Sequence, residues 1–395
     1  MWLLPGMLWT PWSDPWIGSK REVAWTMVYS AEMKRAVGLL RSTLDREGLG
    51  LQDKRFAHHG MHRPDPDAPL ILVACSGGRD SLALACVAHL VADMTGLRCG
   101  ALLIDHGLVP DSDRIAERAA GTCRELGLNP VHVTRVDVPV TSAGPEADAR
   151  AARYQALSEQ ALKLGARVVL LAHTRDDQAE TVLIGLIRSQ GLEAITGMAR
   201  RVERGGMRYL RPFLDMDRKD TTAICRQQGI HWWDDPTNGD DQPAGSTLPE
   251  SLPLRSRIRH DLLPALNRFA GRDMVRRLAL GADMARLDQD YLDTQVDGLL
   301  QRLVARPDSD QRAEGVLACL DARGLADCHP ALRTRLLAQV LTGLGIRFTA
   351  VQVRALDDLV CRWHGQQGPR FPSSHTAIRK GQVILICNDG DHAHR

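Results

Sequence analysis

The sequence predicts an α/β protein with a doubly wound parallel sheet, followed by a mainly helical C-terminal module. Three observations support this fold class. Short apolar runs that suit buried strands alternate with helical stretches between residues 70 and 172. A glycine loop, Ser-Gly-Gly-Arg-Asp-Ser at residues 76–81, joins the first strand to the first helix of this series. After residue 239 the alternation stops and helical periodicity takes over.

The same observations divide the chain into three parts. Residues 1–66 form an N-terminal extension with one helix, expected at residues 33–51, and a linker. Residues 67–240 hold the α/β domain. Residues 241–395 hold a polar, proline-rich linker and the helical module, which ends in a small hairpin at residues 370–386.

Composition narrows the protein class. The 395 residues carry a formal net charge of only +2, so any nucleic-acid-binding surface must be local. The nine cysteines are scattered and contain no CxxC pair, which argues against a disulfide framework or a zinc site and favours the reducing cytoplasm. No apolar run is long enough to span a membrane.

Within the α/β domain, the functional side chains follow the strands. Strands are expected at residues 70–74, 98–104, 131–136 and 167–172, and helices at residues 81–95, 111–126 and 145–164. In doubly wound sheets, ligands bind beyond the carboxyl ends of the strands. Polar groups follow three of these strands at once, at residues 76–81, 105–107 and 173–177. The sequence therefore predicts a site at one edge of the sheet.

The loop at residues 76–81 has the composition of a phosphate cradle. Gly77 and Gly78 let the backbone turn sharply and approach a ligand closely. Ser76 and Ser81 add hydroxyl groups, and the amides that open the next helix attract an anion. Asp80 also lies in the loop, and a carboxylate beside phosphates is repulsive unless a divalent cation lies between them. We therefore expect Mg²⁺ at Asp80.

A second polar cluster follows the fourth strand. His173, Asp177 and Glu180 share one face if a helix begins near His173, and the preceding helical stretch supplies Arg153. Carboxylates and an arginine together suit an amino-acid ligand, because the acids hold ammonium groups and the arginine pairs with the carboxylate. The alternative is a helix N-terminus that is rich in Asp because acids favour that end of the dipole.

The loop Ser-Gly-Gly-Arg-Asp-Ser resembles the SGGxDS loop of the PP-loop ATP pyrophosphatase superfamily, the adenine nucleotide alpha hydrolase-like proteins. Five further segments resemble, in the right order, the successive motifs of bacterial tRNA(Ile)-lysidine synthases. They are residues 104–120, 146–157, 171–198, 209–220 and 232–241. The resemblance runs from about residue 70 to about residue 266 and is far more specific than the loop alone.

This resemblance implies an ATP-dependent ligase that forms a C–N bond. ATP would adenylate O2 of the wobble cytidine (C34) in the CAU anticodon of tRNA(Ile) and release pyrophosphate. The ε-amine of free L-lysine would then attack C2 and release AMP, which gives lysidine. The family also allows a homodimer.

The resemblance assigns roles to the polar residues. ATP would be held by Ser76, Gly77, Gly78, Arg79, Asp80, Ser81, Asp105 and His106, with Asp80 as the metal ligand. The lysine pocket would be formed by Arg153, His173, Asp177 and Glu180. Catalysis would fall to Asp80, Ser81, His173 and Asp177. Either an acid or His173 could accept the proton of the attacking amine, and the sequence does not decide between them.

A basic stretch after the α/β domain is the candidate tRNA surface. Residues 255–277 contain seven arginines and two acids, which suits tRNA phosphates, although an exposed helix face would look the same. The resemblance directs attention to Arg255, Arg257 and Arg259. The family usually has RNxxR here, so Ser256 replaces an asparagine.

Two rival functions remain. A thiolase of the same superfamily would need a sulfur carrier or an iron–sulfur cluster, usually signalled by a CxxC pair that this sequence lacks. A nucleotide-binding module without catalysis would not need an acid in the cradle. Asp80→Asn separates an enzyme from such a non-catalytic module, because a catalyst should lose turnover far more than it loses tRNA binding.

Overall fold

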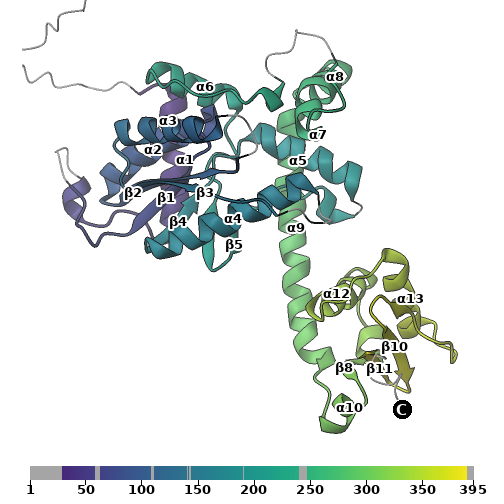
Figure 1. Ribbon diagram of the computed structural model, residues 1–395. Helices are drawn as coiled ribbons and strands as arrows, with labels where there is room; N and C mark the ends of the chain where they lie inside the picture. Colours follow the sequence, from purple (N-terminus) through teal and green to yellow (C-terminus); the bar gives the residue numbers. More distant parts are fainter. Residues whose placement is uncertain are drawn as a thin grey trace, which may run out of the picture.

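The computed structural model describes residues 29–57, 63–107, 111–139, 141, 144–189, 191–239 and 247–388. An α/β domain and a smaller C-terminal body lie at opposite ends of α9 (Met274–Leu303), a single helix of 30 residues (Figure 1). Of the helices described, none is both long and apolar enough to cross a membrane.

The central sheet confirms the predicted fold class. Its strand order is β3-β2-β1-β4-β6-β5, and every neighbouring pair is parallel except β5 with β6. The strands are β1 (Leu70–Ala74), β2 (Arg98–Asp105), β3 (Val131–Arg135), β4 (Ala166–Leu170), β5 (Arg201–Arg204) and β6 (Met207–Leu210). The four expected strands agree within two residues at either end. The sequence reading did not anticipate the hairpin of β5 and β6, which extends the sheet beyond β4.

Helices cover both faces of this sheet, as a doubly wound fold requires. They are α1 (Ala31–Arg46), α2 (Arg79–Thr95), α3 (Ser112–Glu125), α4 (Pro145–Lys163), α5 (Arg175–Arg188) and α6 (Arg218–Gln227). In β1, Ile71 and Val73 face a core shared with α1, α2, α3 and α6. Leu70 and Leu72 face a second core shared with α4. This alternation explains why β1 is apolar at every position.

The first helix is shorter than expected. The reading of residues 33–51 as helical is wrong at the C-terminal end, because α1 stops at Arg46. Gly48 follows with a φ of +71°, a left-handed conformation that glycine adopts at little cost and that ends a helix. A 3₁₀ turn, η1 (Lys54–Ala57), lies in the stretch that follows.

The second half is largely helical, as predicted. It contains α7 (Leu254–Arg257), the π-helical turn η4 (Ile258–Leu262), α8 (Leu263–Ala270), α9, α10 (Ser309–Ala313), α11 (Ala322–Ala326), α12 (Pro330–Gly343) and α13 (Ala350–Cys361). The expected terminal hairpin is present as β10 (His375–Lys380) and β11 (Val383–Asn388).

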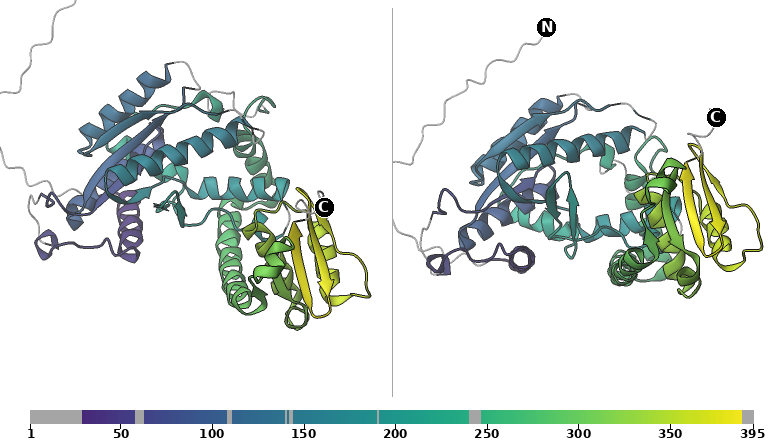
Figure 2. Two further views of the ribbon diagram at one scale, coloured as in Figure 1. Left: turned by 60° about the horizontal axis from the view of Figure 1, so that its bottom comes forward. Right: turned by 90° about the horizontal axis from the view of Figure 1, so that it is seen from below.

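The terminal hairpin is part of a larger sheet than expected. Three further strands, β7 (Val304–Ala305), β8 (Val316–Asp321) and β9 (Arg370–Phe371), join it in the order β7-β8-β11-β10-β9. All neighbours in this sheet are antiparallel. Ile384 and Ile386 of β11 are buried in a core with residues of α12 and α13. Figure 2 shows the yellow strands beside the green helices of this body.

Candidate active site

The loop between β1 and α2 forms a tight cradle. Gly77 has a φ of +79°, and a Cβ there would lie 2.9 Å from Cβ of Ala119 on α3. Glycine is therefore required at this position both for conformation and for space. The hydroxyl of Ser81 holds the loop, because it accepts from the Ser76 backbone amide at 3.2 Å and donates to the Gly78 carbonyl at 2.8 Å.

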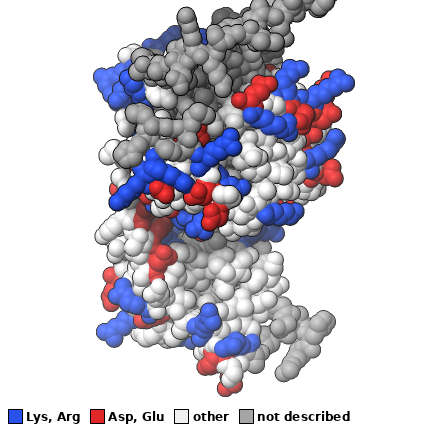
Figure 3. Space-filling view, turned by 90° about the vertical axis from the view of Figure 1, so that its left-hand side faces the viewer, with Lys and Arg blue, Asp and Glu red and all other residues white. Residues whose placement is uncertain are grey.

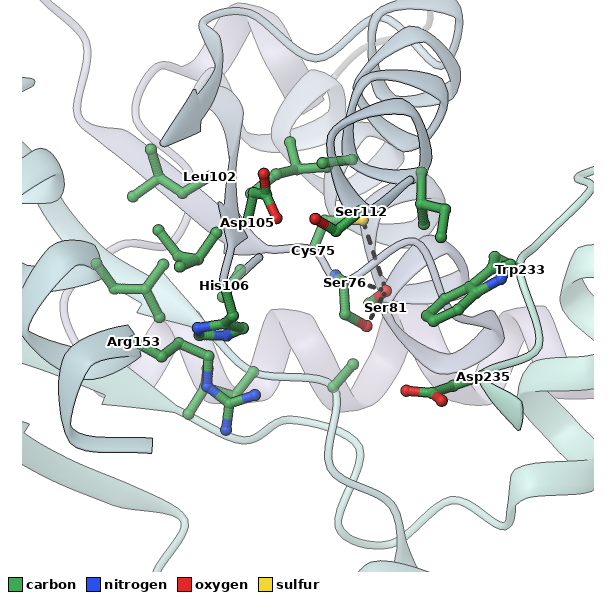
Figure 4. Close-up of a pocket in the computed structure, with 18 of the residues that line it drawn as sticks. Cys75, Ser76, Ser81, Leu102, Asp105, His106, Ser112, Arg153, Trp233 and Asp235 are labelled. Carbon is green, nitrogen blue, oxygen red and sulfur yellow. Dashed lines mark hydrogen bonds between the residues drawn. The ribbon is translucent and has the colours of Figure 1, made fainter. Parts of the chain in front are cut away.

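A cavity of about 420 Å³ opens over this cradle. Four groups of side chains line it: Ser76, Asp80 and Ser81 from the cradle; Asp105 and His106 after β2; Arg153 and Tyr154 from α4; and His173, Trp233 and Asp235. In Figure 4, His106 and Arg153 lie on one side, the two serines lie in the middle, and Trp233 and Asp235 lie on the other side. The carboxyl ends of β1, β2 and β4 thus meet at one site, as the sequence predicted.

Asp105 and His106, the two side chains after β2, differ in charge and in their hydrogen-bond partners. Burial would raise the pKa of Asp105, but hydrogen bonds from Ser112 and from the Gly107 amide, the latter at 2.9 Å, bring that pKa below its usual value. Burial and the charge of Arg153 lower the pKa of His106, so this ring is neutral. Its Nδ1 is buried and has no hydrogen-bond partner among the described residues. A ligand in the cavity could supply one.

Asp80 lies at the cradle end of a chain of charges. Its carboxylate accepts a short hydrogen bond from the Thr221 hydroxyl and lies 3.5 Å from Nε of Arg218, both on α6. Burial raises the pKa of Asp80, whereas Arg218 lowers it in part. The contact with α6 was not expected from sequence, because Arg218 lies 138 residues further along the chain.

Asp177 and Glu180 are already paired with arginines. Glu180 is fully buried and lies 2.7 Å from Nε of Arg259 and 3.2 Å from Arg255. Asp177 lies 3.1 Å from Arg218. Burial would raise the pKa of Asp177, but the charge of Arg218 and the hydrogen bond from the Thr174 amide hold it well below its usual range. We call Asp177, Glu180, Arg218, Arg255 and Arg259 the ion-pair cluster.

The predicted common stripe on one helix is therefore wrong. Helix α5 begins at Arg175, with Thr174 as its cap, and His173 lies before it. Asp177 is the third helical residue and completes a capping box, because its carboxylate accepts from the Thr174 amide at 2.8 Å. His173 and Arg153 line the cavity, whereas Asp177 and Glu180 do not. The predicted lysine-binding set thus divides between the cavity and the ion-pair cluster.

His173 is neutral in this setting. Burial and the nearby Arg211 lower its pKa to about 3, although Asp177 opposes the shift. Nε of Arg211 donates to Nδ1 of His173 at 3.2 Å. Because an arginine can only donate, Nδ1 is the acceptor and the ring proton is on Nε2.

The three arginines predicted to bind tRNA do not form a solvent-facing patch. Arg255 and Arg259 point inward to Glu180. Arg257 is partly exposed and makes no side-chain hydrogen bond or ion pair with the described residues. Ser256 is buried, and its hydroxyl donates to the Thr237 carbonyl at 2.7 Å, which ties α7 to the segment that carries Trp233. A role for these arginines in tRNA binding stays a prediction.

Sequence reasoning did not assign four residues that shape this site: Arg211, Arg218, Trp233 and Asp235. Two segments recognised for their resemblance, residues 209–220 and 232–241, contain all four. The order of motifs was a usable signal, but it does not show which side chain of a segment reaches the cavity.

Comparison with known proteins places the chain. The PP-loop domain family matches residues 53–266, and the TilS substrate binding domain family matches residues 320–383. The tRNA(Ile)-lysidine synthase of Bifidobacterium longum subsp. infantis is 45% identical over 390 residues, covering 93% of this chain and 100% of the relative. That of Streptomyces coelicolor is 42% identical over 325 residues, covering 81% and 86%. The chain belongs to the tRNA(Ile)-lysidine synthase family.

Membership of this family supports the lysidine-synthase reading over both rivals, and makes the chain an ATP-dependent enzyme with a PP-loop domain. Among solved structures, the U34-tRNA thiolase NcsA from Methanococcus maripaludis, with its [4Fe-4S] cluster, gives a TM-score of 0.47 at 14% identity. The match covers 64% of this chain and 78% of that chain, and is too distant to add an argument.

Proposed function

We propose that this enzyme joins L-lysine to C2 of the wobble cytidine in the CAU anticodon of tRNA(Ile). Cytidine O2 attacks the α-phosphorus of ATP and pyrophosphate leaves. The lysine ε-amine then attacks C2, loses a proton, and AMP leaves with the O2 oxygen. The observation that carries the proposal is a single cavity in which a phosphate cradle, Arg153 and His173 meet.

The residues fit ATP and Mg²⁺. The cradle at residues 76–81 offers backbone amides and hydroxyls to phosphates, and His106, whose Nδ1 has no partner among the described residues, lines the same cavity. The described residues contain no cluster of three metal-ligating side chains. Mg²⁺ does not need one, since it is commonly bound by one or two carboxylates together with substrate phosphates. Asp80 would supply that carboxylate, and the ion would offset the charge that develops on the leaving pyrophosphate.

For lysine, Arg153 is the free cation of the cavity lining. It has no carboxylate partner within salt-bridge distance among the described residues, and burial beside Arg150 lowers its pKa. It can therefore pair with the lysine carboxylate. Asp177, which lies outside the cavity lining and pairs with Arg218, is the carboxylate that we assign to an ammonium group. Glu180 reaches the amino acid only if Arg255 or Arg259 moves away, so its resting role is to hold these two arginines.

The tautomer of His173 decides its part in catalysis. Its Nε2 carries the proton, so the ring can donate a hydrogen bond to an oxygen in the cavity but cannot accept the proton of the attacking amine. That proton then goes to a carboxylate.

The proposal includes the partners and the compartment. Arg255, Arg257 and Arg259, together with the C-terminal body matched by the substrate binding domain family, would contact tRNA. Nine free thiols suit the reducing cytoplasm. The homodimer that the family allows stays a prediction, which sedimentation of the free protein would test.

The test is incorporation of labelled lysine into a CAU-bearing tRNA(Ile) transcript with ATP and Mg²⁺, with tRNA(Met) as the matched control. We expect label in the first transcript alone. Release of pyrophosphate without lysine would mean that adenylation is right and the nucleophile is wrong. Neither product, with ATP still bound, would contradict the proposed reaction.

A further inference from the structure

The corner between α8 and α9 carries an unusual set of exposed side chains. Four arginines, Arg268, Arg272, Arg276 and Arg277, are exposed, and none makes an ion pair with a described residue. Phe269 lies among them with 94% of its surface exposed, more than any other large apolar side chain described. We call these five residues the α8–α9 corner. It lies at the end of α9 next to the α/β domain (Figure 1).

The positive charge of this corner is offset only in part, because Asp273 is the one acid between residues 268 and 277 and leaves the stretch with a net charge of +3. Asp273 caps α9 and accepts from the Arg276 amide at 3.0 Å. Asp261 accepts from the Leu248 amide at 3.2 Å. On the face shown in Figure 3, by contrast, Lys and Arg side chains are interspersed with Asp and Glu. The corner is therefore a local basic surface on a chain whose net charge is only +2.

The corner is also connected to the active site by a rigid path. Arg259 contacts Glu180 in the ion-pair cluster, and Phe269 follows ten residues later along continuous helical backbone. Ten helical residues span about 15 Å. Ile258 and Leu263 on this path are buried against Ala179 and Leu183 of α5, the helix that begins next to His173. The corner therefore lies about 15 Å along the helix from the ion-pair cluster, a distance that a few nucleotides can span.

We propose that the α8–α9 corner binds an unpaired part of the tRNA substrate, with Phe269 stacked on a base and the four arginines on the neighbouring phosphates. The inference rests on the proposed function, because it takes tRNA as the substrate. Base stacking on exposed aromatic side chains within a basic surface is how proteins bind single-stranded nucleic acid.

A second copy of the chain is the competing occupant. Leu280 and Met284 continue the exposed face of α9 next to the corner, with 55% and 70% of their surfaces exposed. Pairing two copies through the corner would bring eight arginines together, four from each chain. Like charges at such an interface oppose association. The charge of the corner thus favours RNA over self-association.

The experiment measures binding of the CAU-bearing tRNA(Ile) transcript, and of its isolated anticodon stem–loop, at several salt concentrations. Phe269→Ala should weaken binding of both about 5- to 150-fold, the range for loss of one stacked base. Phe269→Leu should weaken it nearly as much, because leucine keeps apolar area but has no ring. Arg276→Ala with Arg277→Ala should lower the slope of log K against log salt by about 2, one for each lost phosphate contact.

The matched control is Lys34→Ala with Arg41→Ala, which removes the same charge from two exposed positions on α1. Equal effects of the two double variants would overturn the proposal, as would an unchanged affinity for Phe269→Ala. Full affinity in Phe269→Leu would overturn stacking. A free wild-type dimer that Phe269→Ala converts to monomer would make the corner a protein interface and also overturn it. If the wild type incorporates no lysine at all, the proposed function fails instead.

Discussion

The cradle and the ion-pair cluster lie beside each other, but the polar groups of the cradle are open to a ligand, whereas the carboxylates of the cluster are already paired with arginines. The cradle turns toward the cavity, and its serine hydroxyls and backbone are held by short local hydrogen bonds. The ion-pair cluster has its carboxylates covered by arginines from two later segments of the chain. The first can receive an anion as it stands. The second is neutralised by the protein itself.

This difference shows that a buried carboxylate near an active site need not be a binding group. Glu180 has no exposed surface and two close arginines, so removing it leaves uncompensated charge inside the protein. Asp80 touches both regions, because it lines the cavity and also faces Arg218. Variants on each side should therefore fail in different ways, the cluster in stability and the cradle in turnover.

Glu180→Gln should show the largest effect on stability. The free energy of unfolding should fall by about 3–5 kcal/mol, the usual loss when one partner of a buried ion pair is removed. Urea denaturation measures it, with the exposed Glu193→Gln as control. Normal stability with a raised KM for lysine would instead make Glu180 a lysine ligand. The ion-pair cluster would then be a binding region like the cradle.

Asp80→Asn should show the largest effect on catalysis. The variant loses the carboxylate charge that we propose binds Mg²⁺, which should lower kcat about 10²- to 10³-fold. The affinity for tRNA should change little. Steady-state lysine incorporation and tRNA binding measure the two quantities, and Asp67→Asn, at an exposed carboxylate, is the control. A parallel loss of turnover and tRNA affinity would remove the catalytic role from Asp80.

His173 should make the stability of the folded protein depend on pH. Its folded-state pKa of about 3 lies below the unfolded value near 6.5, so the unfolded chain binds the extra proton first. The stability that the neutral ring contributes is complete above pH 6.5 and is lost as pH falls toward 3. Between pH 6 and 4, the wild type should lose up to about 1.4 kcal/mol per pH unit more than His173→Gln. Parallel stability curves would mean that His173 is not held neutral.

Ser256→Ala should show the smallest effect. It removes the hydroxyl that donates to the Thr237 carbonyl, so the free energy of unfolding should fall by about 1 kcal/mol. Thermal unfolding measures the change. A loss of several kcal/mol would show that this one bond holds the segment of Trp233 in place.

The cradle could be read from sequence because every part of it is local. Gly77, Ser81 and the strand before them lie within twelve residues, and glycine, hydroxyl and helix N-terminus each have a direct physical meaning there. The gathering of residues 105–107 and 173–177 could also be predicted, because parallel strands end at one edge. The phosphate cradle and its edge of the sheet are thus the predictable half of the site.

The ion-pair cluster could not be read in the same way. Arg218 reaches Asp80 across 138 residues, and Arg259 reaches Glu180 across 79. Helical periodicity does not specify which of several arginines turns inward. The start of α5 was misjudged for a different reason, since the spacing of Thr174 and Asp177 is that of a capping box and was overlooked. Two strands of the five-stranded terminal sheet were missed because they have only two residues each.

Helix α9 sets the distance between the α/β domain and the C-terminal body. Its 30 residues span about 45 Å, and it packs against α5 at one end and α12 at the other. Neither matched family segment includes it, since one ends at residue 266 and the other begins at residue 320. One inserted residue would move the far body by about 1.5 Å and turn it by about 100°. The helix therefore fixes the separation of the α/β domain and the C-terminal body, which sets the size that any molecule in contact with both must have.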